Sequence, residues 1–438
     1  MNHLERLSPV DFVEFLRQEK IRRFYLAYDP AAKMVKSSHP QLQPLAEFLR
    51  ADGRDFAGHE GLFFQVTEKH DTLQGAFVHR TCRGQAAGGV RYWTYDTVED
   101  YLRDGLRLSK GMTHKSALAG LWWGGGKGVM ARRPDVDSEN PDVRRDIYSE
   151  YGLFLSSLQG CYVTAEDVGT TVADIASVFS RTRFTICVPP EWGGSGNPSV
   201  PTARGIVCAM EAALEFAGKG SLGGKTIAVQ GMGNVGGPLI GFLFEKGVRR
   251  IIACDIDPRT VDSVRRDLAG RDLAARAVSR GDTTIFGEKC DIFSPNATGA
   301  IFNPGTIPQL QTGIVCGAAN NQLEDPVRDD SALLDRGIIY VPDFLANRMG
   351  IVNSADEQSG CLTHDPLIER HLARDWEYSV FRTTLRVLGE SKRTGEPTGR
   401  IAVRQAEKLS LEPHPIFGHR GRQIIDSLVE GGWAKSGI

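Results

Sequence analysis

The pattern of apolar and polar positions predicts alternating strands and helices in the second half of the chain. An apolar run at 226–230 leads into a glycine-rich turn, and a helical apolar pattern follows as far as Gly247. Strand–helix units that repeat in this way are typical of a parallel sheet covered by helices. The later apolar runs that continue the pattern are 250–254, 290–293, 313–316 and 337–341.

An earlier region, residues 59–186, shows a mixed α/β pattern. Apolar runs at 62–66 and 74–78 flank a polar turn and predict two neighbouring strands. A helix is predicted to begin at Thr97, where Thr97 and Asp100 have the spacing of a capping pair ahead of an apolar face. This region is therefore expected to form an α/β domain separate from the parallel-sheet region.

The two ends of the chain carry no chemistry that the sequence identifies. Near the start of residues 1–58, Ser8 and Pro9 predict a helix, with Ser8 as its cap and Pro9 in its first turn. This extension fits an oligomer arm, a lid or a passive addition equally well. We expect domain boundaries that leave an N-terminal extension at 1–58, domains at 59–186 and 187–350, and a C-terminal segment at 351–438.

Composition narrows the class of protein. The 438 residues are 41% hydrophobic and 24% charged, with a formal net charge of −2, so nothing favours nucleic acid or an anionic membrane as a partner. The apolar runs are too short for a membrane span, and early acidic residues do not fit a targeting peptide. The eight cysteines are scattered, which favours buried thiols in a reducing, cytoplasmic compartment and gives no metal-binding spacing.

The glycine-rich turn after the run at 226–230 has the context of a dinucleotide-binding turn. Gly231, Gly233 and Gly236 form a GxGxxG motif between a predicted strand and a predicted helix, and Asp255 lies nineteen residues beyond it. Asp255 is expected to accept hydrogen bonds from a ribose and to favour NAD over NADP, while Arg259 lies near enough to soften that preference. The alternative is that Asp255 is an ordinary turn aspartate.

Two lysines and an aspartate are the candidate catalytic residues. Lys115 and Lys127 lie twelve residues apart, and the second follows three glycines, which can let the backbone approach a bound molecule. If both amines face one pocket, burial and mutual repulsion lower their pKa values toward the range of a general base. Asp167 could exchange protons with a reacting amine. The alternatives are a surface lysine beside a flexible loop, and a helix-capping aspartate.

These motifs resemble those of the glutamate/leucine/phenylalanine/valine dehydrogenase superfamily, most closely the leucine and phenylalanine dehydrogenases. The matching segments keep the family's order over some two thirds of the chain. The resemblance implies an α/β fold with an N-terminal substrate domain, a Rossmann dinucleotide-binding domain, a cleft between them, and C-terminal helices that pack back on the first domain. The segments are 87–96, 111–115, 124–127, 162–171, 195–199, 229–236, 306–310 and 317–323.

The resemblance also implies an activity and a set of site residues. The family oxidises an L-amino acid with NAD⁺ and water to a 2-oxo acid and ammonium, and catalyses the reverse reductive amination. Lys115 would bind the substrate α-carboxylate, Lys127 would activate water, and Asp167 would exchange protons with the substrate nitrogen. The implied substrate-binding residues further include Gly88, Gly89, Met112 and Asn347, and the cofactor-binding residues are Thr202, Gly231, Met232, Gly233, Asn234, Val235, Gly236, Asp255, Ala297 and Asn320.

Three positions complicate the prediction of the substrate, because their residue types either disagree about it or differ from the family pattern. Ala87 stands where glutamate-specific members have a lysine, which removes their anchor for a substrate γ-carboxylate. Ser354, in contrast, matches the serine of glutamate-type members and not the valine typical of leucine-type members. Arg348 replaces a small residue, and it is expected to alter the local backbone or to add a cation near the cleft. Ala87 and Ser354 therefore predict different substrates.

The main hypothesis is an NAD-dependent L-amino-acid dehydrogenase for a leucine-like aliphatic or an aromatic side chain. A second hypothesis is the same chemistry on an acidic or polar amino acid such as glutamate, with Ser354 and Arg348 replacing the missing lysine. A third is a catalytically silent, NAD-binding regulatory homologue. The expected partners are a small-molecule amino acid and further copies of the chain in a homo-oligomer.

Overall fold

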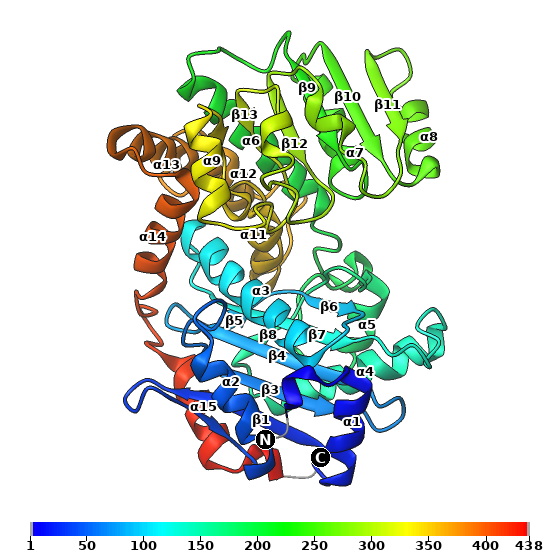
Figure 1. The fold of residues 1–438 in the computed structure, drawn as a ribbon, viewed down its shortest axis with the longest axis vertical. Coiled ribbons are helices and arrows are strands. Elements are labelled where there is room, and N and C mark those ends of the chain that lie inside the picture. Colours follow the sequence, from blue (N-terminus) through cyan, green and yellow to red (C-terminus); the bar gives the residue numbers. More distant parts are fainter. Residues whose placement is uncertain (1–2, 436–438) are drawn as a thin grey trace.

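The computed structural model describes residues 3–435, which form two α/β domains (Figure 1). One sheet belongs to the first half of the chain and the other to residues 226–340, so the predicted two-domain architecture is confirmed. The helices α3 (Val98–Leu118) and α11 (Met349–Asp356) lie where the domains meet.

The first sheet is mixed, with the strand order β2-β1-β3-β4-β7-β5-β8 and β6 paired with β7. The predicted strands at 62–66 and 74–78 are confirmed as β3 and β4, which pair antiparallel with Phe64 opposite Gly75. Thr97 caps α3 by accepting a hydrogen bond from Asp100 N, as predicted. The strands are β1 (Arg23–Asp29), β2 (Met34–Ser37), β3 (Gly61–Val66), β4 (Leu73–Arg80), β5 (Ala86–Ala87), β6 (Val90–Trp93), β7 (Gly124–Ala131) and β8 (Tyr162–Val163).

The described part of residues 1–58 is not a separate extension but part of this sheet. Strand β1 pairs antiparallel with β3, and the Phe24 ring stacks on Phe64 with centroids 4.5 Å apart. One face of the sheet is covered by α1 (Pro9–Gln18), α2 (Gln43–Ala51) and α3. The other face is covered by α4 (Pro141–Ser157), α5 (Val172–Phe179) and α15 (Arg420–Glu430). The described part of this segment is therefore built into the first domain.

The second sheet is parallel throughout, with the order β11-β10-β9-β12-β13-β14. The apolar runs predicted as strands all appear in it, whereas the edge strand β11, with the sequence Leu-Ala-Ala-Arg-Ala, was not predicted because it lacks an apolar run. The predicted glycine motif lies in the turn after β9, at the carboxyl end of the sheet. The strands are β9 (Thr226–Gln230), β10 (Arg250–Asp255), β11 (Leu273–Ala277), β12 (Ile292–Pro295), β13 (Ile314–Val315) and β14 (Ile339–Tyr340).

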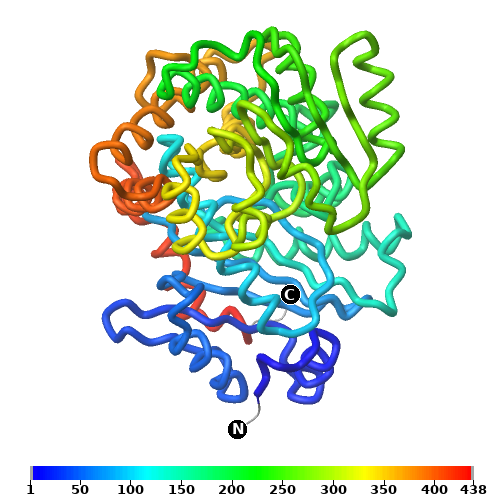
Figure 2. The backbone as a smooth tube through the Cα atoms, turned by 45° about the horizontal axis from the view of Figure 1, so that its top comes forward, coloured from blue at the N-terminus to red at the C-terminus, as the bar shows by residue number. Residues whose placement is uncertain are grey.

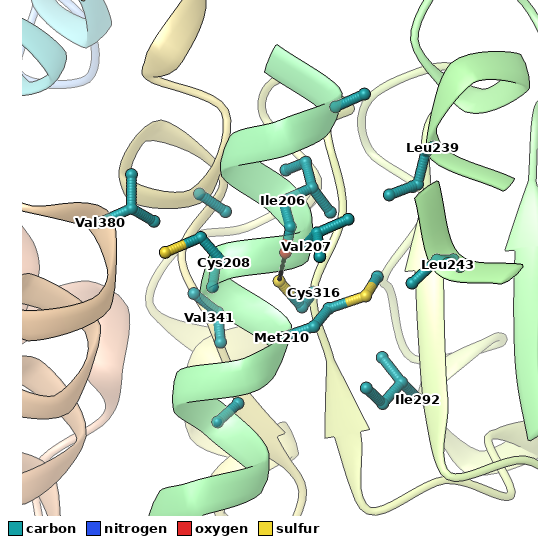
Figure 3. Packing of buried hydrophobic residues seen from close by; sticks show 14 of the residues in the cluster. Ile206, Val207, Cys208, Met210, Leu239, Leu243, Ile292, Cys316, Val341 and Val380 are labelled. Atoms are coloured by element: carbon teal, nitrogen blue, oxygen red, sulfur yellow. Dashed lines mark hydrogen bonds between the residues drawn. The ribbon is translucent and has the colours of Figure 1, made fainter. Parts of the chain in front are cut away.

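Helix α6 (Ser199–Phe216) lies at the centre of the second domain's core (Figure 3). Ile206 and Met210 face the sheet side, toward Leu243 and Ile292, while Cys208 lies on the side of Val380. The helices α7 (Gly236–Glu245) and α8 (Pro258–Asp267) cover the same face of the sheet, and α9 (Arg328–Asp335) covers the opposite face with two short 3-10 segments. Helices on both faces make this a doubly wound sheet.

The C-terminal helices run back along both domains to the first one (Figure 2). Helix α13 (Val380–Thr394) packs on α6, and α14 (Thr398–Ser410) packs on α3. Helix α15 then reaches the first sheet, where Arg422 donates a hydrogen bond to Tyr28 O at 2.8 Å. The remaining elements here are α10 (Asp343–Ala346) and α12 (Pro366–Leu372).

Two general features of the described residues bear on the predictions made from composition. Within residues 3–435, the helices lack the combination of length and apolarity that crossing a membrane needs. All eight cysteines are free thiols, and five of them are buried, whereas Cys361 is exposed.

Candidate active site

Lys115 and Lys127 come together because helix α3 packs directly on strand β7. Lys115 lies in the last turn of α3, and Lys127 is 4% exposed in the middle of β7. The glycines before Lys127 form a strand and not the flexible loop of the alternative interpretation. A side chain at Gly125 would lie 2.1 Å from Thr113 N, so glycine is needed to let the strand approach the helix. The surface-lysine interpretation is therefore wrong for Lys127.

Lys127 forms a buried ion pair with Asp167, which follows strand β8. Lys127 Nζ lies 2.9 Å from Asp167 Oδ2, and the same oxygen accepts a hydrogen bond from Arg91 Nε at 3.2 Å. The capping interpretation of Asp167 is wrong, because Thr171 caps α5 in a capping box with Asp174. Asp167 is instead free to face the lysine.

Burial dominates the electrostatics of this group of residues. It lowers the pKa of Lys127, against the opposing charge of Asp167, and it lowers the pKa of Lys115 to about 8. Burial by itself raises the pKa of Asp167, but Lys127 and Arg91 outweigh it and hold that pKa well below its usual range. The site thus combines lysines that lose protons unusually easily with a carboxylate that stays ionised.

Lys115 also joins the two domains. Its Nζ donates a hydrogen bond of 2.8 Å to Asn320 Oδ1, from the loop after β13. Asn347 Nδ2 donates to the same oxygen at 2.9 Å and to Ala318 O at 2.9 Å. Residues predicted to contact substrate and residues predicted to contact cofactor therefore meet at one point.

The predicted substrate side-chain residues lie in an apolar cluster beside this point. Ala87 is fully buried and packs with Cys187 and Ile351. Ser354 lies on α11, where its hydroxyl donates to Gly350 O at 2.9 Å and lies 3.1 Å from Cys187 Sγ. The hydroxyl of Ser354 therefore already has partners within the chain.

The predicted glycine pair is shaped by the chain's own packing. A side chain at Gly88 would meet Gly126 O at 2.0 Å and Met112 at 2.9 Å, and one at Gly89 would meet Glu166 O at 2.3 Å. Both glycines thus keep β5 and β6 close to β7 and to the segment that carries Asp167.

Arg348 does not face the candidate active site, contrary to the prediction that it adds a cation there. It is fully buried, and its guanidinium donates to Leu118 O at 2.7 Å, to Thr383 Oγ1 at 3.1 Å and to Tyr378 O. Burial lowers its pKa to about 9. Arg348 therefore joins the end of α3 to α13, where its guanidinium supplies donors to buried carbonyl oxygens.

The glycine-rich turn has the geometry that a dinucleotide requires. Gly231 has a φ of +88°, a side chain at Gly236 would meet Gly231 O at 2.0 Å, and one at Gly233 would meet nothing within 4 Å. These correspond to a tight turn, close helix packing and an open approach for a pyrophosphate. Asp255 Oδ2 accepts a hydrogen bond from Met232 N at 2.7 Å.

The other predicted cofactor residues surround this turn or the helix α6. Ala297 lies against Gly231, Asn234 is exposed, and Val235 directly precedes α7. Thr202 lies in the first turns of α6, where its hydroxyl donates to Pro198 O at 2.9 Å. In residues 3–435, His, Cys, Asp and Glu side chains nowhere form a group of three that could hold a metal ion.

Three charged or polar residues near the lysines were not predicted as part of the site. Arg91 contacts Asp167, Asp104 contacts Arg91, and Asp343 accepts a hydrogen bond from Asn321 N at 2.7 Å. Asp343 follows β14, and its position at a carboxyl strand end is the signal that could have identified it. Arg91 and Asp104 have no comparable local signal, because their contacts join separate elements.

Comparison with known proteins places the chain in a family. The family model "Glu/Leu/Phe/Val dehydrogenase, dimerisation domain" matches residues 63–184, and "Glutamate/Leucine/Phenylalanine/Valine dehydrogenase" matches residues 193–369. The chain is 40% identical to leucine dehydrogenase of Geobacillus stearothermophilus over 332 residues, 76% of this chain and 85% of that protein. It is 34% identical to phenylalanine dehydrogenase of Lysinibacillus sphaericus over 371 residues, 84% and 93% of the two chains.

A solved structure is also similar to the chain in fold and in sequence. The crystal structure of L-tryptophan dehydrogenase from Nostoc punctiforme matches with a TM-score of 0.63 and 32% identity, covering 81% of this chain and 96% of that chain. The two family models together span most of the described residues, including every element that carries Lys115, Lys127 and Asp167. The chain therefore belongs to the glutamate/leucine/phenylalanine/valine dehydrogenase family and is an amino-acid dehydrogenase.

Proposed function

We propose that the protein catalyses NAD-dependent oxidative deamination of an L-amino acid with an aliphatic or aromatic side chain, and the reverse reductive amination. The observation that carries the proposal is the buried ion pair of Lys127 and Asp167 beside Lys115 and an apolar cluster. The overall reaction converts the amino acid, NAD⁺ and water to the 2-oxo acid, ammonium, NADH and a proton. A catalytically silent homologue would have no physical need for such a lysine pair.

Each of the three charged residues has a distinct role in this proposal. Lys115 donates hydrogen bonds to the substrate α-carboxylate, which takes the place of Asn320 Oδ1 on its Nζ. Asp167, held as a carboxylate, accepts a proton from the substrate ammonium group. Lys127, as the neutral amine, takes a proton from the water that attacks the substrate Cα after oxidation. The turn at Gly231, Gly233 and Gly236 would hold the dinucleotide, which would supply the hydride acceptor for Cα.

The residues of the glycine-rich turn fit such a dinucleotide. Gly233 leaves open backbone at the N-terminal end of α7, where unpaired N–H groups and the helix dipole favour a pyrophosphate. The carboxylate of Asp255 at the end of β10 favours NAD over NADP, because it would repel a 2′-phosphate. Arg259, the cation that could offset it, pairs with Asp257 at 3.3 Å through a side chain that is 92% exposed.

A substitution at Gly233 tests this fit. Replacing Gly233 with valine should leave the fold intact, since a side chain there meets nothing within 4 Å. It should block the pyrophosphate and weaken NAD binding by about tenfold or more, which corresponds to roughly 1.4 kcal/mol. Isothermal titration with NAD⁺ measures the affinity, and thermal unfolding controls for the fold. Unchanged affinity would rule out this turn as the cofactor site.

The surroundings of Ala87 favour an apolar substrate side chain over glutamate. Ala87, Cys187 and Ile351 form an apolar wall, and the Ser354 hydroxyl donates to Gly350 O. Arg348, the cation that glutamate would need, points into the contact between α3 and α13. An acidic side chain would therefore be buried here without a partner, which is costly.

The proposed roles give a specific pH dependence. Because burial lowers the pKa of Lys127 from its usual value of 10.5, the neutral amine forms at lower pH than for an exposed lysine, so kcat for deamination should rise between pH 7 and 10. Lys115, with a pKa of about 8 in the free enzyme, loses its charge over the same range, so KM for the amino acid should also rise. Steady-state kinetics separate the two effects, and a flat kcat would contradict a lysine base.

Stoichiometry tests the reaction class. Purified protein with NAD⁺ and L-leucine or L-phenylalanine should produce NADH and ammonium in equal amounts. NADH without ammonium would contradict deamination, and NAD⁺ binding without turnover on any amino acid would favour the regulatory alternative.

The proposal also includes a homo-oligomer in the cytoplasm. The match of residues 63–184 to a family model described as a dimerisation domain supports an assembly of several copies. Eight free cysteines are typical of a reducing compartment.

A further inference from the structure

We propose that Arg91 is a positioning residue for catalysis, which draws the negative charge of Asp167 away from Lys127 and thereby keeps Lys127 available as the neutral base. Asp104 in turn opposes Arg91 and limits this effect. The inference rests on the proposed roles of Lys127 and Asp167.

The first observation is that two cations share one carboxylate oxygen. Asp167 Oδ2 accepts a hydrogen bond from Lys127 Nζ at 2.9 Å and from Arg91 Nε at 3.2 Å. Arg91 lies on β6, which pairs with β7 in parallel, with Arg91 opposite Val129. Two neighbouring strands thus hold the guanidinium and the lysine on the same side of Asp167.

The second observation is that the far end of Arg91 is fixed by Asp104 on α3. Arg91 Nη1 donates to both oxygens of Asp104, at 3.0 and 3.1 Å, and the Tyr95 hydroxyl donates to Asp104 Oδ2 at 2.6 Å. Arg91, Tyr95 and Asp104 also line a hollow of about 330 Å³. The guanidinium therefore lies between this hollow and the catalytic pair, held at both ends.

The charges around Lys127 decide the sign of each effect. Burial is the main cause that lowers the pKa of Lys127, and Arg91 lowers it further, whereas Asp167 and Asp104 raise it. Charges a few ångströms apart interact strongly where water is excluded. The other titratable groups here are Lys115 on α3, with Asp343 on α10 beside it, and Tyr162 on β8 and Glu166, which lie near Asp167.

Burial raises the pKa of the Tyr162 hydroxyl, so Tyr162 stays neutral. Lys115, with a pKa of about 8, and Glu166, with a pKa of about 7, titrate in the wild type and in the variants alike. Arg91 and Asp104 are the opposed charges that the test removes, and their removal shifts the pKa of Lys127 in opposite directions.

The test compares kcat for deamination against pH in the wild type and in three variants of the full-length protein. Arg91→Met should move the rising limb to higher pH by about one unit, so kcat near pH 8 falls about tenfold while kcat near pH 10 approaches that of the wild type. Arg91→Lys, which keeps the charge, should restore most of the wild-type profile. Asp104→Asn should move the limb to lower pH, by about half a unit.

The opposite signs distinguish this inference from a purely structural role. If Arg91 only holds the fold together, both Arg91→Met and Asp104→Asn will lower kcat by the same factor at every pH, and that result would overturn the proposal. If Arg91→Met does not fold, as thermal unfolding would reveal, the Asp104→Asn shift still decides the question. No turnover by the wild type on any amino acid would instead defeat the proposed function itself.

Discussion

Replacing Lys127 with alanine will lower kcat for deamination by about 10³-fold, while NAD⁺ binding stays unchanged. General-base catalysis by one positioned side chain contributes typically about 10²–10⁴-fold. Lys127 is 4% exposed, burial lowers its pKa, and its Nζ lies 2.9 Å from Asp167 Oδ2. Removing the amine also leaves Asp167 paired with Arg91 alone. The change is measured by the initial rate of NADH formation and by titration with NAD⁺.

A surface lysine provides the matched control. Lys69 has a 63% exposed side chain and pairs with Asp146 on the first domain, so Lys69→Ala should change kcat less than twofold. Turnover that survives Lys127→Ala at the wild-type level would mean that another group activates the water.

Replacing Arg348 with methionine will lower the free energy of unfolding by about 2–4 kcal/mol, without changing which amino acids are turned over. The substitution leaves Leu118 O, Tyr378 O and Thr383 Oγ1 without their donor, and each unpaired buried acceptor costs about 1–3 kcal/mol. Removing a buried charge offsets part of this cost. Urea denaturation measures the loss of stability, and rates with leucine and glutamate measure the preference.

The control for this variant is Arg382, which is exposed on the same helix α13. Arg382→Met should change stability by no more than about 0.5 kcal/mol. If the protein turned over glutamate, and only Arg348→Met abolished that activity, Arg348 would have to contact the substrate. This result would contradict its placement in the contact between α3 and α13.

The second domain could be predicted because its signals are local. Its main signals follow one another in the chain: the apolar run at 226–230, the glycines of the turn and Asp255. In the structure the glycine turn follows β9, and Asp255 ends the neighbouring strand β10. Strand β11 was not predicted because it lies at the edge of the sheet and is mostly half-buried, so it needs no long apolar run.

The first domain was harder to predict because long-range contacts decide it. Strand β1 is completed by pairing with β3, and the glycines before Lys127 form a strand because Thr113 of α3 packs against them. The sequence left open whether the two lysines face one pocket, because that depends on the packing of α3 on β7. The alternative that Asp167 caps a helix is wrong, because Thr171 caps α5 four residues later.

The same distinction applies to the charged residues. The direction of Arg348 depends on carbonyl groups of α3 and α13, and the contact of Arg91 with Asp167 joins β6 to the segment after β8. The spacing of these residues in the sequence does not show these contacts. The roles of Lys115 and Lys127 stay predictions, which rest on the residue types and on the resemblance to the family.

The most direct measurement is the initial rate of NADH formation by the purified protein with NAD⁺ and a panel of L-amino acids that includes leucine, phenylalanine and glutamate. Turnover of leucine or phenylalanine, with glutamate at background, is the predicted result, because an apolar wall around Ala87 replaces the anchor for an acidic side chain. Turnover of glutamate alone would contradict this account of the site, and so would the absence of turnover across the panel while NAD⁺ still binds.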